Sequence, residues 1–235
     1  MTGAVSADVD RDGFQLVMGV LDEGARRDLA EALGPADGAG RRGLLAMRAV
    51  DALARSERLL NLMRPFVGPA ARPVRAIYFD KSPDANWLVP WHQDLTIAVR
   101  ERIDAPGFGL WSIKEGVPHV QPPVELLARM LAVRLHLDDA DESNGALRVL
   151  AGSHLCGRLE ADEIAEWRTR GAEIVCPAAA GDALLMRPLL LHASSKSTSS
   201  RSRRVVHIEY AGFDLPTGMD WHEGSIAQGR STTLE

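Results

Sequence analysis

A histidine and an aspartate two positions apart, His92 and Asp94, are the first candidates for chemistry in this 235-residue chain. They end a run, residues 88–92, whose composition and bounding Pro, Asn and Asp residues favour a strand. Side chains two positions apart on a strand point to the same face, so the imidazole and the carboxylate should converge. A lone His-x-Asp pair is a weak signal, because such pairs also serve at surfaces and in hydrogen bonds.

A second histidine, His192, ends the apolar run of residues 181–192 about a hundred positions later. A loop rich in Ser, Lys and Thr follows at once, which predicts a strand end at the mouth of a barrel. Two imidazoles and one carboxylate leave up to three open positions on one face of an octahedral metal. That arrangement suits non-haem iron(II) oxygenases.

Arg203 begins the run of residues 203–210, eleven positions after His192. The short connection predicts that this strand lies antiparallel and next to the strand that bears His192. A buried guanidinium there could pair bidentately with the distal carboxylate of a 2-oxo acid, and Ser194 could add a hydroxyl donor. Arg201 and Arg204 are rivals, and Arg203 and Arg204 must face opposite sides of a strand.

The elements that must position these residues form a helical part followed by a strand-rich part. Residues 13–20 suggest a strand, Asp22 is a candidate N-cap for a helix to about residue 33, and residues 46–54 and 57–66 repeat at helical spacing. Helical pieces are also expected at residues 124–128 and 162–170. The expected later strands are residues 74–79, 88–92, 95–99, 109–112, 130–137, 146–150, 173–176, 183–187 and 203–211. This order predicts a mainly β double-stranded β-helix, a jelly-roll or cupin-like barrel, with flanking N-terminal helices.

Length and composition predict one domain over residues 1–235, with a helical layer to residue 70, a core at 72–211 and a tail at 212–235. The net charge of −5 and the absence of a basic stripe argue against a nucleic-acid partner. Residues 1–12 have no signal-peptide pattern and no stretch is apolar enough to span a bilayer, which predicts a cytoplasmic protein without membrane contact. Cys156 and Cys176 are isolated, so neither a zinc site nor a disulfide is expected.

The whole pattern resembles the phytanoyl-CoA dioxygenase-like family of 2-oxoglutarate oxygenases over roughly residues 72–210. The matching pieces are residues 91–94, 137–140, 144–154 and 181–192, and Arg203. The resemblance implies iron(II) held by His92, Asp94 and His192, with 2-oxoglutarate and dioxygen as co-substrates. It also implies that Arg203 and Ser194 bind 2-oxoglutarate and that Gln93 and Trp111 line its pocket.

The reaction implied by this resemblance is hydroxylation of an unactivated C–H bond of a small molecule, with release of succinate and carbon dioxide. Relatives that halogenate have Gly or Ala in place of the metal carboxylate, so Asp94 favours hydroxylation. The family usually has Pro before Gly-Ser-His, where this chain has Ala151. Two rivals stay open: a cupin-type isomerase or hydrolase that uses the triad without 2-oxoglutarate, and a non-enzymatic binding barrel.

Residues 111–123 mix Trp, Lys, Glu, His and Gln and are expected to form an irregular loop, either a substrate lid or a solvated connector. Lys114 in this segment and Arg134 on an expected strand are candidates to pair with an anionic substrate. Arginine outnumbers lysine 24 to 3 in the chain, so Lys81, Lys114 and Lys196 stand out.

Overall fold

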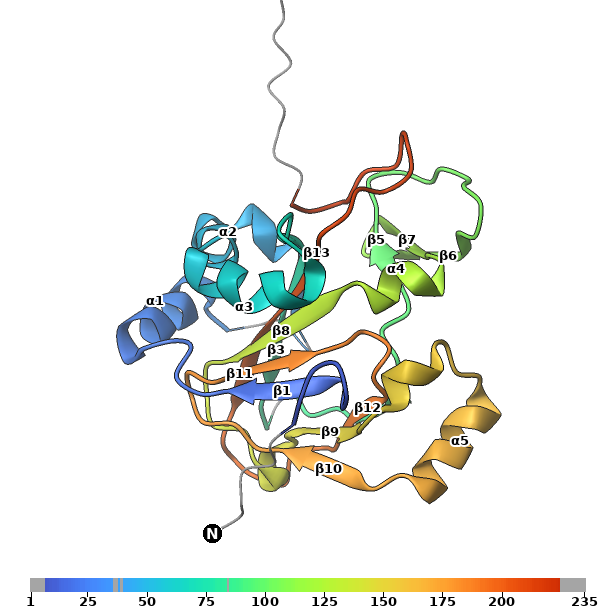
Figure 1. The fold of residues 1–235 in the computed structure, drawn as a ribbon. Helices are drawn as coiled ribbons and strands as arrows, with labels where there is room; N and C mark the ends of the chain where they lie inside the picture. The colour runs from blue at the N-terminus through green and yellow to red at the C-terminus, as the bar shows by residue number, and fades with distance from the viewer. Residues whose placement is uncertain (1–6, 36–37, 39, 84, 225–235) are drawn as a thin grey trace, which may run out of the picture.

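Two antiparallel sheets face each other, and a third, smaller sheet lies at their side in the computed structural model, which describes residues 7–35, 38, 40–83 and 85–224 (Figure 1). The six-stranded sheet has the order β1 (Phe14–Val17), β11 (Ala183–Met186), β8 (Leu131–His136), β13 (Arg203–Ala211), β3 (Arg72–Lys81) and β2 (Gly40–Arg42). The four-stranded sheet has the order β10 (Glu173–Cys176), β9 (Leu147–Leu150), β12 (His192–Ser194) and β4 (Val89–His92). The small sheet consists of β5 (Ile97–Ala98), β7 (Val117–Gln121) and β6 (Gly109–Lys114). The predicted mainly β jelly-roll architecture is confirmed.

Alternation along β13 divides the side chains between two environments. Arg203, His207 and Glu209 point between the sheets, where they line a cavity, because successive side chains of a strand face opposite ways. Ile208 and Tyr210 point to the other face and are fully buried in the largest hydrophobic core. The central strand of the large sheet therefore carries polar chemistry on one face and the packing core on the other.

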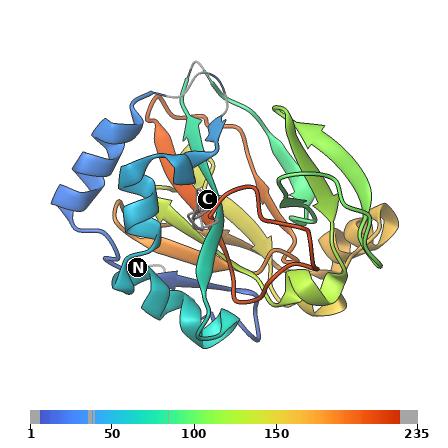
Figure 2. The ribbon, with the colours of Figure 1, turned by 90° about the horizontal axis from the view of Figure 1, so that it is seen from above.

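Three helices cover the outer face of the six-stranded sheet: α1 (Glu23–Leu33), α2 (Arg48–Ala54) and α3 (Glu57–Val67) (Figure 2). The Asp22 side chain accepts a hydrogen bond from the amide of Ala25 and begins α1, as the sequence predicts. Leu59 and Met63 of α3 are fully buried against the sheet. This apolar layer holds the large sheet rigid behind the cavity.

The outer face of the four-stranded sheet is covered by α5 (Ala161–Arg170), whose Ile164 and Trp167 pack against Leu150 and Leu191. The remaining short helices are α4 (Val124–Ala128), η1 (Leu44–Ala46), η2 (Glu142–Asn144) and η3 (Ser153–Cys156). Both cysteines are free thiols. Among the described residues, no helix is both long and apolar enough to cross a membrane.

Two expectations about connections were wrong. Residues 111–123 are not an irregular loop, because β6 and β7 pair as a hairpin with Ser112 opposite His119. The strand that begins at Arg203 does not lie next to the strand that bears His192: β13 pairs with β3 and β8, whereas β12 pairs with β4 and β9. The apolar run breaks after Met186, ahead of Pro188, so His192 begins a new strand in the opposite sheet.

The expected C-terminal tail is in part an element of the core. Met219 and Trp221 are buried in a cluster with Val74 and Leu127, and Trp221 forms an isolated β-bridge with Val99. Residues 225–235 of the tail, and residues 1–6 of the segment without a signal-peptide pattern, lie outside the described residues.

Candidate active site

The two histidines and the aspartate come together at one end of the four-stranded sheet. β12 pairs with β4 so that His192 lies directly opposite His92, and the two ring centroids are 4.2 Å apart. Asp94 follows β4, and its amide donates a hydrogen bond of 2.8 Å to the carbonyl of Pro188. One potential ligand atom from each of the three residues lies within 4.8 Å of the other two. Among the described residues this is the only group of His, Cys, Asp or Glu side chains with that geometry.

Backbone carbonyls orient both imidazoles. Nδ1 of His92 lies 2.9 Å from the carbonyl oxygen of Pro90, and Nδ1 of His192 lies 2.9 Å from that of Leu190. Because a carbonyl oxygen only accepts, Nδ1 carries the proton in each ring, and the Nε2 lone pair is free. The Nε2 atoms lie 3.7 Å from the two carboxylate oxygens of Asp94, one imidazole to each oxygen.

The protonation states suit a divalent cation. Burial alone would raise the pKa of Asp94, but the nearby histidines, His192 first, outweigh it and lower the pKa to about 2. Burial lowers the pKa of His192 to about 4 against the opposing effect of the Asp94 charge. At neutral pH the site therefore offers an ionised carboxylate and a neutral imidazole, which are the metal-binding forms of these groups.

A cavity of about 310 Å³ lies between the two large sheets and reaches all three residues of the triad. Val89, Leu147 and Phe79 supply apolar parts of its wall. The basic side chains among its lining residues are Arg42, Arg75, Lys114, Arg134 and Arg203. A cavity with this excess of positive charge is built for anions.

Arg203 opens β13 and points into this cavity. Only 3% of the residue is exposed, and its Nε and Nη1 atoms have no hydrogen-bond partner among the described residues. Burial, followed by the charge of Arg134, lowers the pKa of Arg203 to about 9, which leaves it charged at neutral pH. Arg204 faces the opposite side and forms a two-point ion pair with Asp138, with N–O distances of 2.8 and 2.7 Å. Of the rival arginines, Arg203 is the one that lines the cavity.

Lys81 is a functional candidate that the sequence pattern did not assign to the site. It pairs with Arg203 across β3 and β13, and its Nζ donates hydrogen bonds to Ser194 Oγ (2.9 Å) and to the Ser195 carbonyl (2.6 Å). Burial, followed by the charge of Arg203, lowers the pKa of Lys81 to about 7. Only the strand register, which no local pattern reveals, would have placed this lysine beside Arg203.

The hydroxyl of Ser194 donates to the carbonyl of Gly145 at 2.8 Å, so the serine links Lys81 to the connection before β9. Gly145 has φ of +77°, and a Cβ atom there would lie 2.5 Å from the Ser195 carbonyl oxygen. A larger residue would therefore push this connection away from Ser194. Gly145 lies in residues 144–154, one of the segments on which the family resemblance rests, and it helps to shape the pocket directly.

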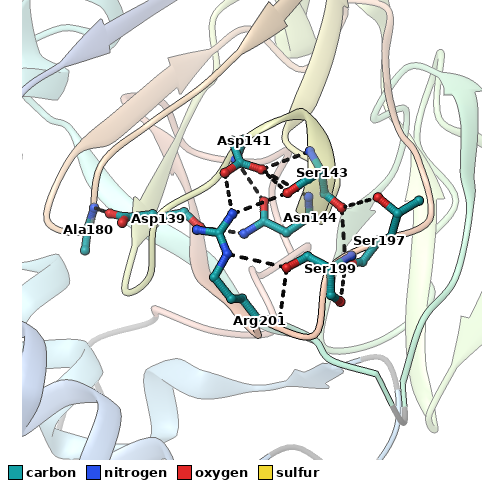
Figure 3. Close-up of polar contacts among 9 residues, drawn as sticks. Asp139, Asp141, Ser143, Asn144, Ala180, Ser197, Ser199 and Arg201 are labelled. Carbon is teal, nitrogen blue, oxygen red and sulfur yellow. Dashed lines mark hydrogen bonds and ion pairs between the residues drawn. The ribbon is translucent and has the colours of Figure 1, made fainter.

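The segment between β12 and β13 is tied to the β8–β9 connection, as Figure 3 shows. The Arg201 guanidinium pairs with the carboxylate of Asp141, and the amide of Thr198 donates to the carbonyl of Ser143 at 2.7 Å. Asp141 also caps η2 through the amides of Ser143 and Asn144. This network fixes both ends of the segment, and the ends carry Ser194 and Arg203.

Gln93 and Trp111 do not line the cavity, which corrects the placement implied by the family resemblance. Gln93 points to the opposite side from its neighbours His92 and Asp94, and its Nε2 donates to the carbonyls of Gly157 (2.7 Å) and Leu189 (2.6 Å). Trp111 belongs to the small sheet, where the Arg102 guanidinium lies 5.4 Å from its ring centroid.

Both residues suggested for an anionic substrate do line the cavity. Arg134 lies on β8, and its Nη1 is 3.4 Å from Nδ1 of His207. Lys114 ends β6, and its Nζ donates a hydrogen bond of 3.2 Å to Thr96 Oγ1. The two side chains approach from different sheets.

The model of the phytanoyl-CoA dioxygenase (PhyH) family matches residues 9–205 of the chain. A curated relative, the probable alpha-ketoglutarate-dependent hypophosphite dioxygenase of Stutzerimonas stutzeri, is 27% identical over 208 residues. The match covers 79% of this chain and 63% of the relative, so the chain spans less than two thirds of that protein's length.

Solved structures of similar fold cover most of the chain. EctD from S. alaskensis, crystallised with 2-oxoglutarate and 5-hydroxyectoine, has a TM-score of 0.66 and 19% identity, and the match covers 90% of this chain and 76% of EctD. The non-haem alpha-ketoglutarate-dependent epimerase SnoN from nogalamycin biosynthesis has a TM-score of 0.62 and 21% identity, with 96% and 95% covered. At these identities the similarity establishes the fold.

Proposed function

Because the chain belongs to the phytanoyl-CoA dioxygenase family, we propose that it is an iron(II)- and 2-oxoglutarate-dependent dioxygenase that acts on a small molecule. His92, Asp94 and His192 hold the metal. Arg203 and Ser194, together with Lys81, bind the distal carboxylate of 2-oxoglutarate, and the Ser194 hydroxyl turns from the Gly145 carbonyl to donate to it. Iron at such a triad supplies dioxygen activation coupled to the oxidation of 2-oxoglutarate to succinate and carbon dioxide.

The observation that carries the proposal is the buried, unpaired guanidinium of Arg203 in the same cavity as the triad. A buried charge without a partner is costly, so a site that keeps one is suited to bind an anion that supplies the missing hydrogen bonds. The carboxylate geometry of a 2-oxo acid matches a guanidinium bidentately. A cupin-type isomerase or hydrolase that uses only the metal triad would have no use for Arg203.

Different groups of the site have different roles in the proposed function. Carbonyls of Pro90 and Leu190 fix the rings of His92 and His192 before a metal binds, which lowers the cost of assembling the site. Lys81 holds Ser194 in place and adds positive charge next to Arg203. Phe79, Val89 and Leu147 supply apolar parts of the cavity wall beside these groups.

We further propose that the outcome is hydroxylation of a C–H bond of the primary substrate. The intact carboxylate of Asp94 supports this proposal, because it occupies a coordination position that a halide would otherwise take. The relatives include a protein named as an epimerase, so the mass of the product decides: a gain of one oxygen atom supports hydroxylation, and an unchanged mass contradicts it.

The direct test of the co-substrate assignment is calorimetric titration of manganese-loaded protein with 2-oxoglutarate. Arg203→Ala should weaken binding by at least about tenfold, since a charge-assisted bidentate contact is lost. Arg204→Ala, which changes the neighbouring arginine on the opposite face, is the matched control and should leave the affinity unchanged. Equal affinity of wild type and Arg203→Ala would overturn the assignment and favour the cupin rival.

A further inference from the structure

The cavity has a basic group at each of two ends, and only one of them belongs to the proposed 2-oxoglutarate site. Arg203 pairs with Lys81 at one end of the β13–β3 ladder, and Glu209 pairs with Arg75 six residues further along. Six residue steps on a strand separate the two Cα pairs by about 20 Å. Arg203 at one end and Arg75 and Glu209 at the other nevertheless line the same cavity.

One molecule of 2-oxoglutarate does not serve both ends. A five-carbon dicarboxylate spans roughly 6 Å, because each C–C bond is about 1.5 Å long. Bound between Arg203 and the metal triad, it would leave the Arg75 end of the cavity free. The charges at that end therefore need another explanation.

Three cations gather at that end, and we call Arg42, Arg75 and Lys114 the basic rim. Arg75 pairs with Glu209 at 3.1 Å, and Arg42 of β2 pairs with Glu115 in the turn between β6 and β7. Both arginines already have a carboxylate partner. They are positioned to add a second contact to an incoming anion.

Lys114 differs from these two arginines. Among the described residues no carboxylate forms an ion pair with it, and its hydrogen bond goes to the neutral hydroxyl of Thr96. Burial, then Arg75 and Arg42, lowers the pKa of Lys114, while Asp94 and Glu209 oppose the shift. An ammonium that is half-buried among other cations lacks a negative partner, which a bound ligand would provide.

We propose that the basic rim, with Lys114 at its centre, binds an oxyanion group of the primary substrate, a carboxylate or a phosphonate-type group. This inference rests on the proposed function, in which the substrate lies beside the metal. Thr96, the partner of Lys114, is two residues from Asp94, so an anion on Lys114 holds the remainder of the substrate close to the triad. Arg134 lies on β8, on the opposite side of β13 from β3, where it faces His207, and it does not belong to the rim.

The test uses the protein loaded with iron(II) and saturating 2-oxoglutarate under anaerobic conditions, so that 2-oxoglutarate occupies the Arg203 end of the cavity. Propanoate and methylphosphonate serve as the two anionic probes, propanamide serves as the neutral probe, and binding is measured by calorimetry. Lys114→Met should weaken binding of the preferred anion by at least about tenfold, the factor expected for one lost charge-assisted hydrogen bond. Lys114→Arg keeps the charge and should retain most of the affinity.

Lys196→Met is the matched control, because Lys196 is exposed and does not line the cavity. It should bind both anions as the wild type does. The preferred probe tells a carboxylate substrate from a phosphonate-type one. Equal binding by wild type and Lys114→Met, binding of propanamide as tight as propanoate, or no binding of either anion would overturn the proposal.

A repeat of the titration with metal-free protein separates this proposal from the proposed function. If the triad fails to bind iron and 2-oxoglutarate but the anion still binds in a Lys114-dependent way, the rim is an anion site and the dioxygenase assignment fails. If iron and 2-oxoglutarate bind normally but Lys114→Met has no effect on anion binding, the rim proposal alone is overturned.

Discussion

Two buried cations, Lys81 and Arg203, face each other across neighbouring strands, and among the described residues neither forms an ion pair with a carboxylate. The two positive charges repel each other, and the pKa of Lys81 falls to about 7 through burial and through the charge of Arg203. A bound carboxylate would reverse that shift, because an opposite charge favours the protonated amine. At the scale of single residues, this uncompensated positive charge favours the binding of an anion.

We therefore predict that the affinity for 2-oxoglutarate falls as the pH rises through about 7. Above that pH, free Lys81 is neutral and must take up a proton when the dicarboxylate binds, which costs free energy. The dissociation constant should rise several-fold between pH 6.5 and 8.5 in the wild type, as measured by calorimetry. Lys81→Met should bind more weakly at pH 6.5 and show no such rise, and Lys196→Met should behave as the wild type. A flat wild-type profile would contradict the role of Lys81.

At the scale of elements, the crossing from β12 to β13 determines whether Ser194 and Arg203 reach the same pocket. The segment passes from one sheet to the other and is held by the Asp141–Arg201 pair (Figure 3) and by the hydrogen bond from the Thr198 amide to Ser143. The tether is at the surface, so it contributes little to global stability, but it fixes local geometry.

Arg201→Ala should loosen this crossing without unfolding the protein. We expect faster amide hydrogen exchange at residues 196–200, a severalfold weaker affinity for 2-oxoglutarate, and a loss of at most about 1 kcal/mol in the free energy of unfolding. Arg170→Ala removes an exposed ion pair on α5 instead and serves as the control. Unchanged exchange in Arg201→Ala would show that the tether does not order the segment.

The sequence predicted most elements because their signals are local. Helix α1 begins after Asp22 and most strands lie within a few residues of their expected bounds, since capping and alternation are properties of neighbouring residues. The short strand β7 was missed because Pro118 lies within it and its residues are mixed in polarity.

The predictions that failed depended on which strands pair. A run from residue 181 to 192 looks continuous in sequence, yet it turns at Pro188 into the opposite sheet. The same limit applies to the site: the triad was expected from motifs, whereas the position of Lys81 beside Arg203 and that of Arg75 beside Glu209 follow from the register of β3 and β13. Long-range pairing is set by tertiary packing, which local patterns do not record.

At the scale of the whole molecule, an apolar helical layer lies behind the sheet that carries most of the charged residues of the cavity. Helices α1, α2 and α3 bury one face of the large sheet, and Ile164 and Trp167 of α5 pack on part of the outer face of the four-stranded sheet. His136 on β8 is 1% exposed, and burial, followed by Arg134 and Arg203, lowers its pKa to about 3. Folding therefore requires the neutral imidazole.

This burial predicts a loss of stability in mild acid. The unfolded chain, in which the pKa of His136 is about 6.5, binds a proton between pH 6.5 and 3 that the folded chain does not bind. Stability is therefore full above pH 6.5 and is lost as the pH falls. The His136 contribution between pH 7 and 5 should be about 1 to 2 kcal/mol in urea unfolding. In His136→Gln the free energy of unfolding should depend less steeply on pH. The control His222→Gln, at an exposed site, should show the same pH dependence as the wild type.

The most direct test of the central claim is the visible charge-transfer absorption of the iron(II)–2-oxoglutarate chelate in anaerobically prepared protein. We predict a weak band in the wild type that disappears in His192→Ala and that needs more 2-oxoglutarate to appear in Arg203→Ala. Arg204→Ala should give the wild-type titration. A wild-type protein that binds iron(II) but gives no band with 2-oxoglutarate would contradict the account and leave the triad as a metal site of another enzyme class.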